Sequence, residues 1–132
     1  MIRIAAVLTA FATPLHAQPL CEALETLGQT GVADVSGLPP VSCNLSHQLD
    51  GKTGMHCSWP FAYRSDASQS AFADMLDQVS ACGAKIEGEQ STVSHPDSYD
   101  QRLFQVGNQI VSVALKDKSA LDETYIFLSV TQ

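Results

Sequence analysis

The stretch RLFQVGNQIVSVAL, residues 102–115, decides the fold class of this chain. Gly107 and Asn108 form a two-residue turn signal between two segments rich in apolar and β-branched residues. Such a pattern predicts a tight antiparallel hairpin. In that hairpin Phe104 lies opposite Val111 on an apolar face. We therefore expect an antiparallel sheet at the centre of the fold.

Two of the expected strands are apolar on both faces. In the strand after the turn, Ile110 and Ala114 lie on the opposite side from Val111, and TYIFLSVT at 124–131 has the same character. A continuous apolar run is typical of a buried strand, so we expect both in the middle of the sheet. Residues 84–93, AKIEGEQSTV, are a weaker and more polar strand candidate.

A helix is predicted over residues 66–82. Ser65 or Asp66 can cap its start, and Gly83 suits the position beyond its end. Apolar residues recur on one face with helical spacing: Phe72, Met75, Leu76, Val79 and Cys82. We expect this apolar face to form the main contact between a helix and the sheet.

A shorter helix is predicted over residues 20–28, with Pro19 in its first turn and Gly28 at its end. Its apolar face is formed by Leu20, Cys21, Leu24 and Leu27.

A second hairpin is predicted with arms at 41–47 and 54–63, around an Asp-Gly turn signal at 50–51. The second arm carries three alternating aromatic residues: Trp59, Phe61 and Tyr63. Alternation places them on one face. We expect that face to be core under the helix; if exposed, it would be a protein-binding surface.

Helices and strands are segregated along the chain, which indicates an α+β fold. The expected order is α-ββ-α-ββ(β)β, with two helices packed on one face of an antiparallel sheet and two disulfides.

The four cysteines are Cys21, Cys43, Cys57 and Cys82. An even number in an oxidising compartment predicts two disulfides, with three possible connectivities. The second hairpin places Cys43 near Cys57, and the apolar faces of the two helices carry Cys21 and Cys82. We therefore predict the pairs Cys43–Cys57 and Cys21–Cys82.

The N-terminus has the layout of a signal peptide at 1–17, with Arg3, an apolar run at 4–12 and the small Ala17. We therefore expect one domain at 18–132, located in the periplasm or secreted. The run is too short to span a bilayer, which takes roughly 20 residues. Membrane insertion after cleavage is not expected.

The chain has 7 basic and 14 acidic residues and a net charge of −7; removing Arg3 makes it −8. Such a charge disfavours nucleic acid and anionic lipid as partners. It suits plain solubility or a basic protein partner. No signature for a cofactor stands out.

Two cysteines and two histidines lie close together: Cys43, His47, His56 and Cys57. Their spacing lacks the C-x2-C clip of a zinc site. His56 and Cys57 are neighbours, so on a strand they point to opposite faces. A disulfide with two surface histidines is the favoured interpretation, and redox or metal chemistry is the alternative.

Two segments gather candidate binding residues, SHPDSYD at 94–100 and the polar connection at 116–123. Loops held on a rigid scaffold are frequent binding sites. The candidates are His95, Asp97, Tyr99, Asp100, Lys116 and Lys118. His95 and Asp97 beside several serines also hint at hydrolysis, but no G-x-S-x-G motif accompanies them. Ordinary turn chemistry at 96–98 and a solvated connection at 116–123 are the simpler interpretations of the two segments.

The sequence therefore favours a small exported, non-enzymatic binding module, such as an inhibitor, an immunity-like protein or an accessory protein. It would present the loops 94–100 and 116–123 to a partner, which we expect to be a protein and a basic one. Redox or metal binding at Cys43 and Cys57, with His47 and His56 nearby, is the alternative.

Overall fold

The computed structural model describes residues 19–47, 49–87, 91–93 and 99–132, so the predicted signal peptide lies outside them. These residues form two α-helices, nine strands and one short 3-10 helix. The helices are α1 (Pro19–Thr30), α2 (Asp66–Ser80) and the 3-10 helix η1 (Ser119–Leu121). The strands are β1 (Val32–Ala33), β2 (Val41–Ser42), β3 (Asn44–His47), β4 (Thr53–Ala62), β5 (Ala84–Lys85), β6 (Ser91–Val93), β7 (Tyr99–Val106), β8 (Gln109–Lys118) and β9 (Glu123–Thr131).

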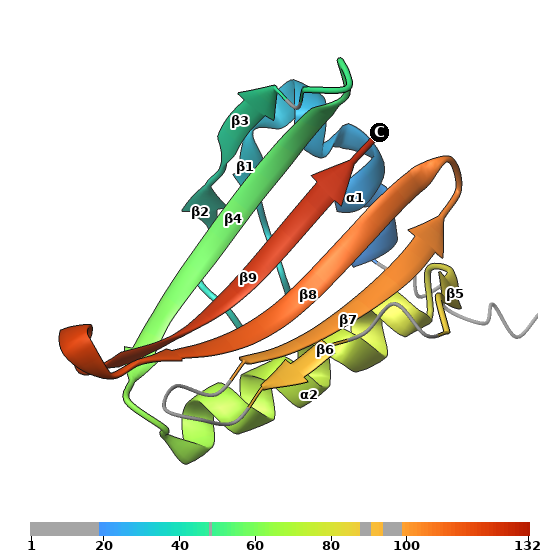
Figure 1. The fold of residues 1–132 in the computed structure, drawn as a ribbon. Coiled ribbons are helices and arrows are strands. Elements are labelled where there is room, and N and C mark those ends of the chain that lie inside the picture. The colour runs from blue at the N-terminus through green and yellow to red at the C-terminus, as the bar shows by residue number, and fades with distance from the viewer. Residues whose placement is uncertain (1–18, 48, 88–90, 94–98) are drawn as a thin grey trace, which may run out of the picture.

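The main sheet is antiparallel and has the order β3-β4-β9-β8-β7-β5, with β6 also paired to β7. Strands β1 and β2 form a separate two-stranded sheet. Both α1 and α2 lie behind the main sheet in Figure 1, on the same face. The α+β fold with two helices on one face is confirmed, as is the central position of β8 and β9.

The hairpin that decides the fold class has the predicted register. Phe104 pairs with Val111, and Val106 pairs with Gln109 across the Gly107–Asn108 turn. The second hairpin is formed by β3 and β4, with Asn44 opposite His56. The weak candidate at 84–93 supplies only the short edge strands β5 and β6.

Helix α1 continues past the predicted end at Gly28. It ends at Thr30, and Gly31 follows with a φ of 66°, where its N–H donates to the Leu27 carbonyl at 2.9 Å. A glycine with positive φ is a common helix terminator, so Gly31 takes the role predicted for Gly28.

Helix α2 is capped by Ser65, whose Oγ accepts from the Ser68 N–H at 3.2 Å. The helix ends at Ser80, two residues before the predicted end. Gly83 does not act as the predicted C′ residue with positive φ. A Cβ built there would lie 2.1 Å from the Gln105 carbonyl oxygen. Gly83 instead allows the chain after α2 to approach β7 closely.

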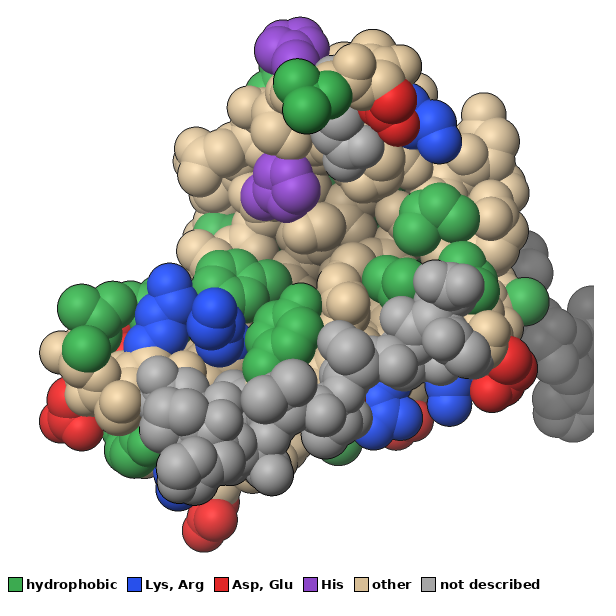
Figure 2. All heavy atoms as spheres, in the orientation of Figure 1, with side chains coloured by type: hydrophobic (Ala, Val, Ile, Leu, Met, Phe, Trp, Pro, Cys, Tyr) green, Lys and Arg blue, Asp and Glu red, His purple; other side chains and the backbone are tan. Residues whose placement is uncertain are grey.

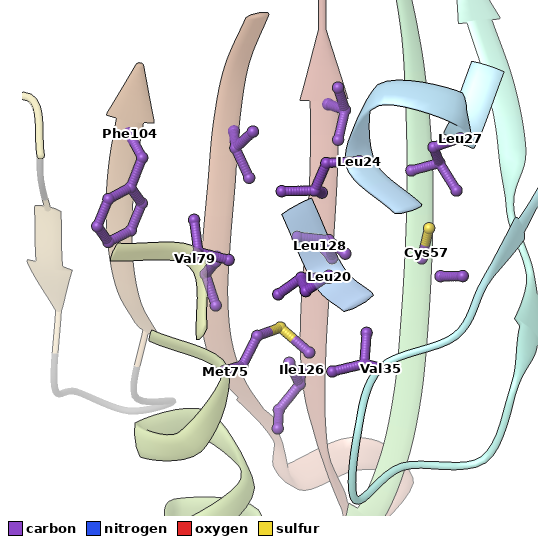
Figure 3. Packing of buried hydrophobic residues seen from close by; sticks show 14 of the residues in the cluster. Leu20, Leu24, Leu27, Val35, Cys57, Met75, Val79, Phe104, Ile126 and Leu128 are labelled. Carbon is purple, nitrogen blue, oxygen red and sulfur yellow. The ribbon is translucent and has the colours of Figure 1, made fainter. Parts of the chain in front are cut away.

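The core lies between the helices and the sheet, as Figure 3 shows. Labelled side chains that meet in this layer are Leu20, Leu24, Leu27, Met75, Val79, Ile126 and Leu128. Trp59 joins this core at 1% exposure and donates from Nε1 to the Pro39 carbonyl at 2.9 Å. Phe61 packs against the core, and Tyr63 lies beyond the end of β4. The core interpretation therefore holds for Trp59 and Phe61.

Both predicted disulfides are present, Cys21–Cys82 and Cys43–Cys57. The first joins α1 to the segment after α2, and the second joins the residue before β3 to β4. Disulfides of this kind are typical of proteins from oxidising, extracellular compartments.

Candidate functional site

The two predicted binding segments meet in the structure. Tyr99 at the start of β7 pairs with Lys116 near the end of β8. The Lys116 Nζ lies 5.8 Å from the centroid of the Tyr99 ring. Both residues therefore lie on one face and at one end of the sheet, as their use in a common site requires.

The other residues of the first segment are not part of this contact. His95 and Asp97 lie outside the described residues. Asp100 follows Tyr99 on β7 and so points to the opposite face. It accepts from Arg102 at 2.7 and 3.0 Å. This hydrogen-bonded pair raises the pKa of the Arg102 guanidinium.

The segment 116–123 is not the loop that its polar sequence suggests. Strand β8 continues to Lys118, and β9 begins at Glu123. The reason is Asp117, which is 3% exposed although it is charged. Its carboxylate accepts from Thr124 Oγ1 at 2.7 Å and from Arg64 Nε at 3.0 Å. These bonds hold the ends of β8 and β9 together.

The face of the sheet opposite the helices carries a cluster that we call the lysine–aromatic patch. Its residues are Tyr99, Lys116, Lys118, Tyr125 and Phe127. The Lys118 Nζ lies 5.2 Å from the Tyr125 ring centroid and 5.8 Å from that of Phe127. The two rings stack with centroids 5.7 Å apart. Figure 2 shows Lys and Arg side chains beside hydrophobic ones on this face, near the end that carries the β8–β9 turn.

Sequence reasoning missed Tyr125 and Phe127, which it placed in a buried central strand. The useful signal is their alternation with Ile126 and Leu128, which face the core. Lys116 pairs with Tyr125 and so shares its face. Only the register between β8 and β9 brings the lysines to these rings.

The Tyr125 hydroxyl donates a hydrogen bond to the Glu123 carboxylate at the edge of the patch. That bond stabilises the protonated phenol and raises the pKa of Tyr125 above its ordinary value. The bond also ties the start of β9 to the ring that Lys118 covers.

A polar cluster occupies the other end of the same face. The His56 ring lies 2.7 Å from Ser46 Oγ through Nε2 and 2.9 Å from Ser129 Oγ through Nδ1. A Cβ on Gly54 would lie 3.1 Å from Ser46 Oγ and 3.2 Å from His56 Nε2. The glycine therefore leaves room for the histidine between the serines. No local pattern in the sequence indicates this contact between three strands.

The alternative site around Cys43 has a different geometry from a metal centre. Cys43 and Cys57 are bonded to each other, and Cys57 is buried on the helix side of β4. His56 is exposed on the opposite face, as neighbouring strand positions require. Among the described residues, no group of three or more His, Cys, Asp or Glu side chains is placed to hold a metal ion.

A shallow groove of about 600 Å³ lies on the helix layer. It runs between α1, the turn at 36–37 and α2, and its lining includes Leu20, Asp74 and Asp77. The helix layer is thus acidic where the opposite face carries lysines.

Comparison with models of known protein families, with curated proteins and with solved structures finds no match for this chain. Among the described residues, no helix combines the length and the apolar character needed to cross a membrane.

Proposed function

We propose that this protein is a small exported, non-enzymatic binding module. It holds a protein partner on the face of its main sheet opposite α1 and α2, which we call the open face. The observation that carries the proposal is the lysine–aromatic patch. Three aromatic rings and two ammonium groups gather on a face that neither helix covers. Tyrosine and phenylalanine side chains are enriched where proteins bind one another, so the three rings carry the proposal and the two lysines give the surface its charge.

The patch lies mainly on the two central strands of the main sheet. Lys116 and Lys118 belong to β8, and Tyr125 and Phe127 belong to β9, which are adjacent central strands. The opposite side of these strands packs on the core, and two disulfides restrain the chain around it. A surface that is ordered before binding loses less entropy when it binds.

Selection of peptides from a displayed random library tests this proposal, with the oxidised domain as bait. We expect selected peptides to lose about tenfold in affinity on Lys116→Ala or Phe127→Ala, since truncating a central contact costs at least about 1.4 kcal/mol. Glu25→Ala and Asp77→Ala, on the helix layer, are the matched controls and should leave affinity unchanged. Peptides that respond only to the control changes would overturn the proposal.

A further inference from the structure

The charges of α1 and α2 differ in sign from those of the two lysines in the lysine–aromatic patch. Neither α1 nor α2 contains a lysine or an arginine, whereas they carry Glu22, Glu25, Asp66, Asp74 and Asp77. The lysine–aromatic patch on the other side carries two lysines, although the chain as a whole is acidic. The net charge of the chain suggests a basic partner. The two lysines of this surface suggest an acidic one instead.

Neither ammonium group forms an ion pair within the described residues, although Glu123 lies opposite Lys118 across β8 and β9 and accepts from the Tyr125 hydroxyl. Both ion pairs within the described residues use arginine side chains, Arg64 with Asp117 and Arg102 with Asp100. Lys116 and Lys118 instead lie over aromatic rings, at 5.2 to 5.8 Å from the centroids. A cation above a ring keeps donors for an anion that approaches from solvent.

The spacing of the patch matches an extended chain. Lys116 and Lys118 are two residues apart on one strand, and Tyr125 and Phe127 repeat the same interval on the next. Side chains at i and i+2 of a strand lie about 7 Å apart on one face. An extended segment with carboxylates at alternate positions has the same period and can meet both lysines at once.

Two other occupants fit this face less well. In β8 and β9 this face offers one carboxylate, Glu123, for two lysines, so a symmetric interface with a second copy would leave excess positive charge on both sides. A sugar that stacks on aromatic rings needs open ring faces, and here ammonium groups lie over all three rings.

We infer that the lysine–aromatic patch binds an extended acidic segment of a partner protein, with carboxylates at alternate positions that pair with Lys116 and Lys118. This inference rests on the proposed function and adds the chemistry of the partner. Apolar side chains of such a segment would pack on the exposed edges of Tyr125 and Phe127.

Synthetic peptides test the inference against the ¹⁵N-labelled domain. The probe is a short peptide of alternating glutamate and threonine. One control has the same composition with its glutamates contiguous, and another replaces glutamate with lysine. We expect the alternating acidic peptide to bind most tightly and to shift the amide signals of Lys116, Lys118 and Tyr125. Its affinity should fall as salt is added, because exposed charge pairs are screened.

Reversing the charge of Lys116 and Lys118 tests whether these two lysines bind the acidic peptide. The double variant Lys116→Glu with Lys118→Glu should weaken binding about tenfold, while the matched variant Lys52→Glu with Lys85→Glu should change it by less than about twofold. Should the reversal disturb folding, Lys116→Gln with Lys118→Gln gives the same test without new charges. The amide spectrum reports folding in each case.

The outcomes separate the two proposals. Equal binding of the alternating and contiguous peptides, tighter binding of the lysine peptide, or tighter binding of an acidic polysaccharide such as polygalacturonate overturns the acidic-segment inference. If library peptides still lose affinity on Lys116→Ala and Phe127→Ala, the proposed function stands without it. If no peptide responds to any patch variant, both fall.

Discussion

The two faces of the main sheet use the same strands in different ways. On the helix side, Val111, Val113 and Ile126 are all 0% exposed. One position along, Ser112 and Phe127 are only partly buried on the face opposite α1 and α2. The apolar residues on the two sides of β8 and β9 therefore have different roles. One set forms the core, and the other stays partly exposed in the lysine–aromatic patch, which we propose as a binding surface.

Charge follows the same division. The helix layer carries its acidic residues on the outer sides of α1 and α2. The open face carries Lys116 and Lys118 over aromatic rings, with the single carboxylate of Glu123 at the edge of the patch. Net charge alone does not describe such a molecule, because a partner meets one face at a time. Local charge decides which group it pairs with at the short range over which charges are not screened.

The largest effect is expected at the disulfide that ties the helix layer together. Cys21→Ser with Cys82→Ser removes a link across 61 residues and should cost about 4 kcal/mol of unfolding free energy, because a longer loop gains more entropy when opened. Cys43→Ser with Cys57→Ser removes a link across 14 residues and should cost about 3 kcal/mol. Urea unfolding measures both. A larger loss from the second pair would contradict the prediction.

The two faces can be compared at neighbouring positions of β9. Ile126→Ala empties a fully buried site and should cost about 3 kcal/mol. Phe127→Ala removes a half-buried ring on the open face, and should cost about 1 kcal/mol from lost stacking on Tyr125. Urea unfolding gives the stabilities. Similar costs at both positions would mean that the open face also belongs to the core.

The close approach of the helix layer to β7 can be tested at a glycine. Gly83→Ala places a Cβ 2.1 Å from the Gln105 carbonyl oxygen, against backbone that has little room to move. We expect a loss of about 2 kcal/mol in urea unfolding.

The control is Gly28→Ala inside α1, where a Cβ would meet nothing within 4 Å. Alanine is the better helix former, so this change should add up to about 1 kcal/mol. A neutral effect at Gly83 would show that the segment after α2 is not held against β7.

Much of the fold could be predicted because its signals are local. The turn at 107–108 determines the pairing of Phe104 with Val111, and the spacing of apolar residues places Cys21 and Cys82 in the helix layer. The predicted helix ends are less accurate, because the sequence does not show which glycine near a helix end has a positive φ. Gly28 stays inside α1, and only the backbone shows that Gly31 terminates it.

The candidate site could be predicted only in part. The sequence identified Tyr99, Lys116 and Lys118, but not the rings that Lys118 covers. Identifying those rings requires the register of β8 with β9. The sequence around Asp117 does not indicate this register, because a buried carboxylate cannot be told from a loop residue by its sequence. Its partners Arg64 and Thr124 come from other segments, and nothing local indicates them.

The smallest effect is expected at Tyr125, where the open face carries a titrating group. Its hydroxyl donates to the Glu123 carboxylate, which raises the pKa of Tyr125 above its ordinary value. Because the folded-state pKa is the higher one, this bond stabilises the fold below the unfolded-state pKa, and the contribution disappears as pH rises through the folded-state pKa. Glu123→Gln should therefore lower the pKa of Tyr125, seen in the phenolate absorbance after subtraction of a Tyr125→Phe titration. Asp122→Asn is the adjacent control and should leave it in place. An unchanged pKa in Glu123→Gln would show that Glu123 does not hold the ring that Lys118 covers, and the patch would then lack its anchor at the start of β9.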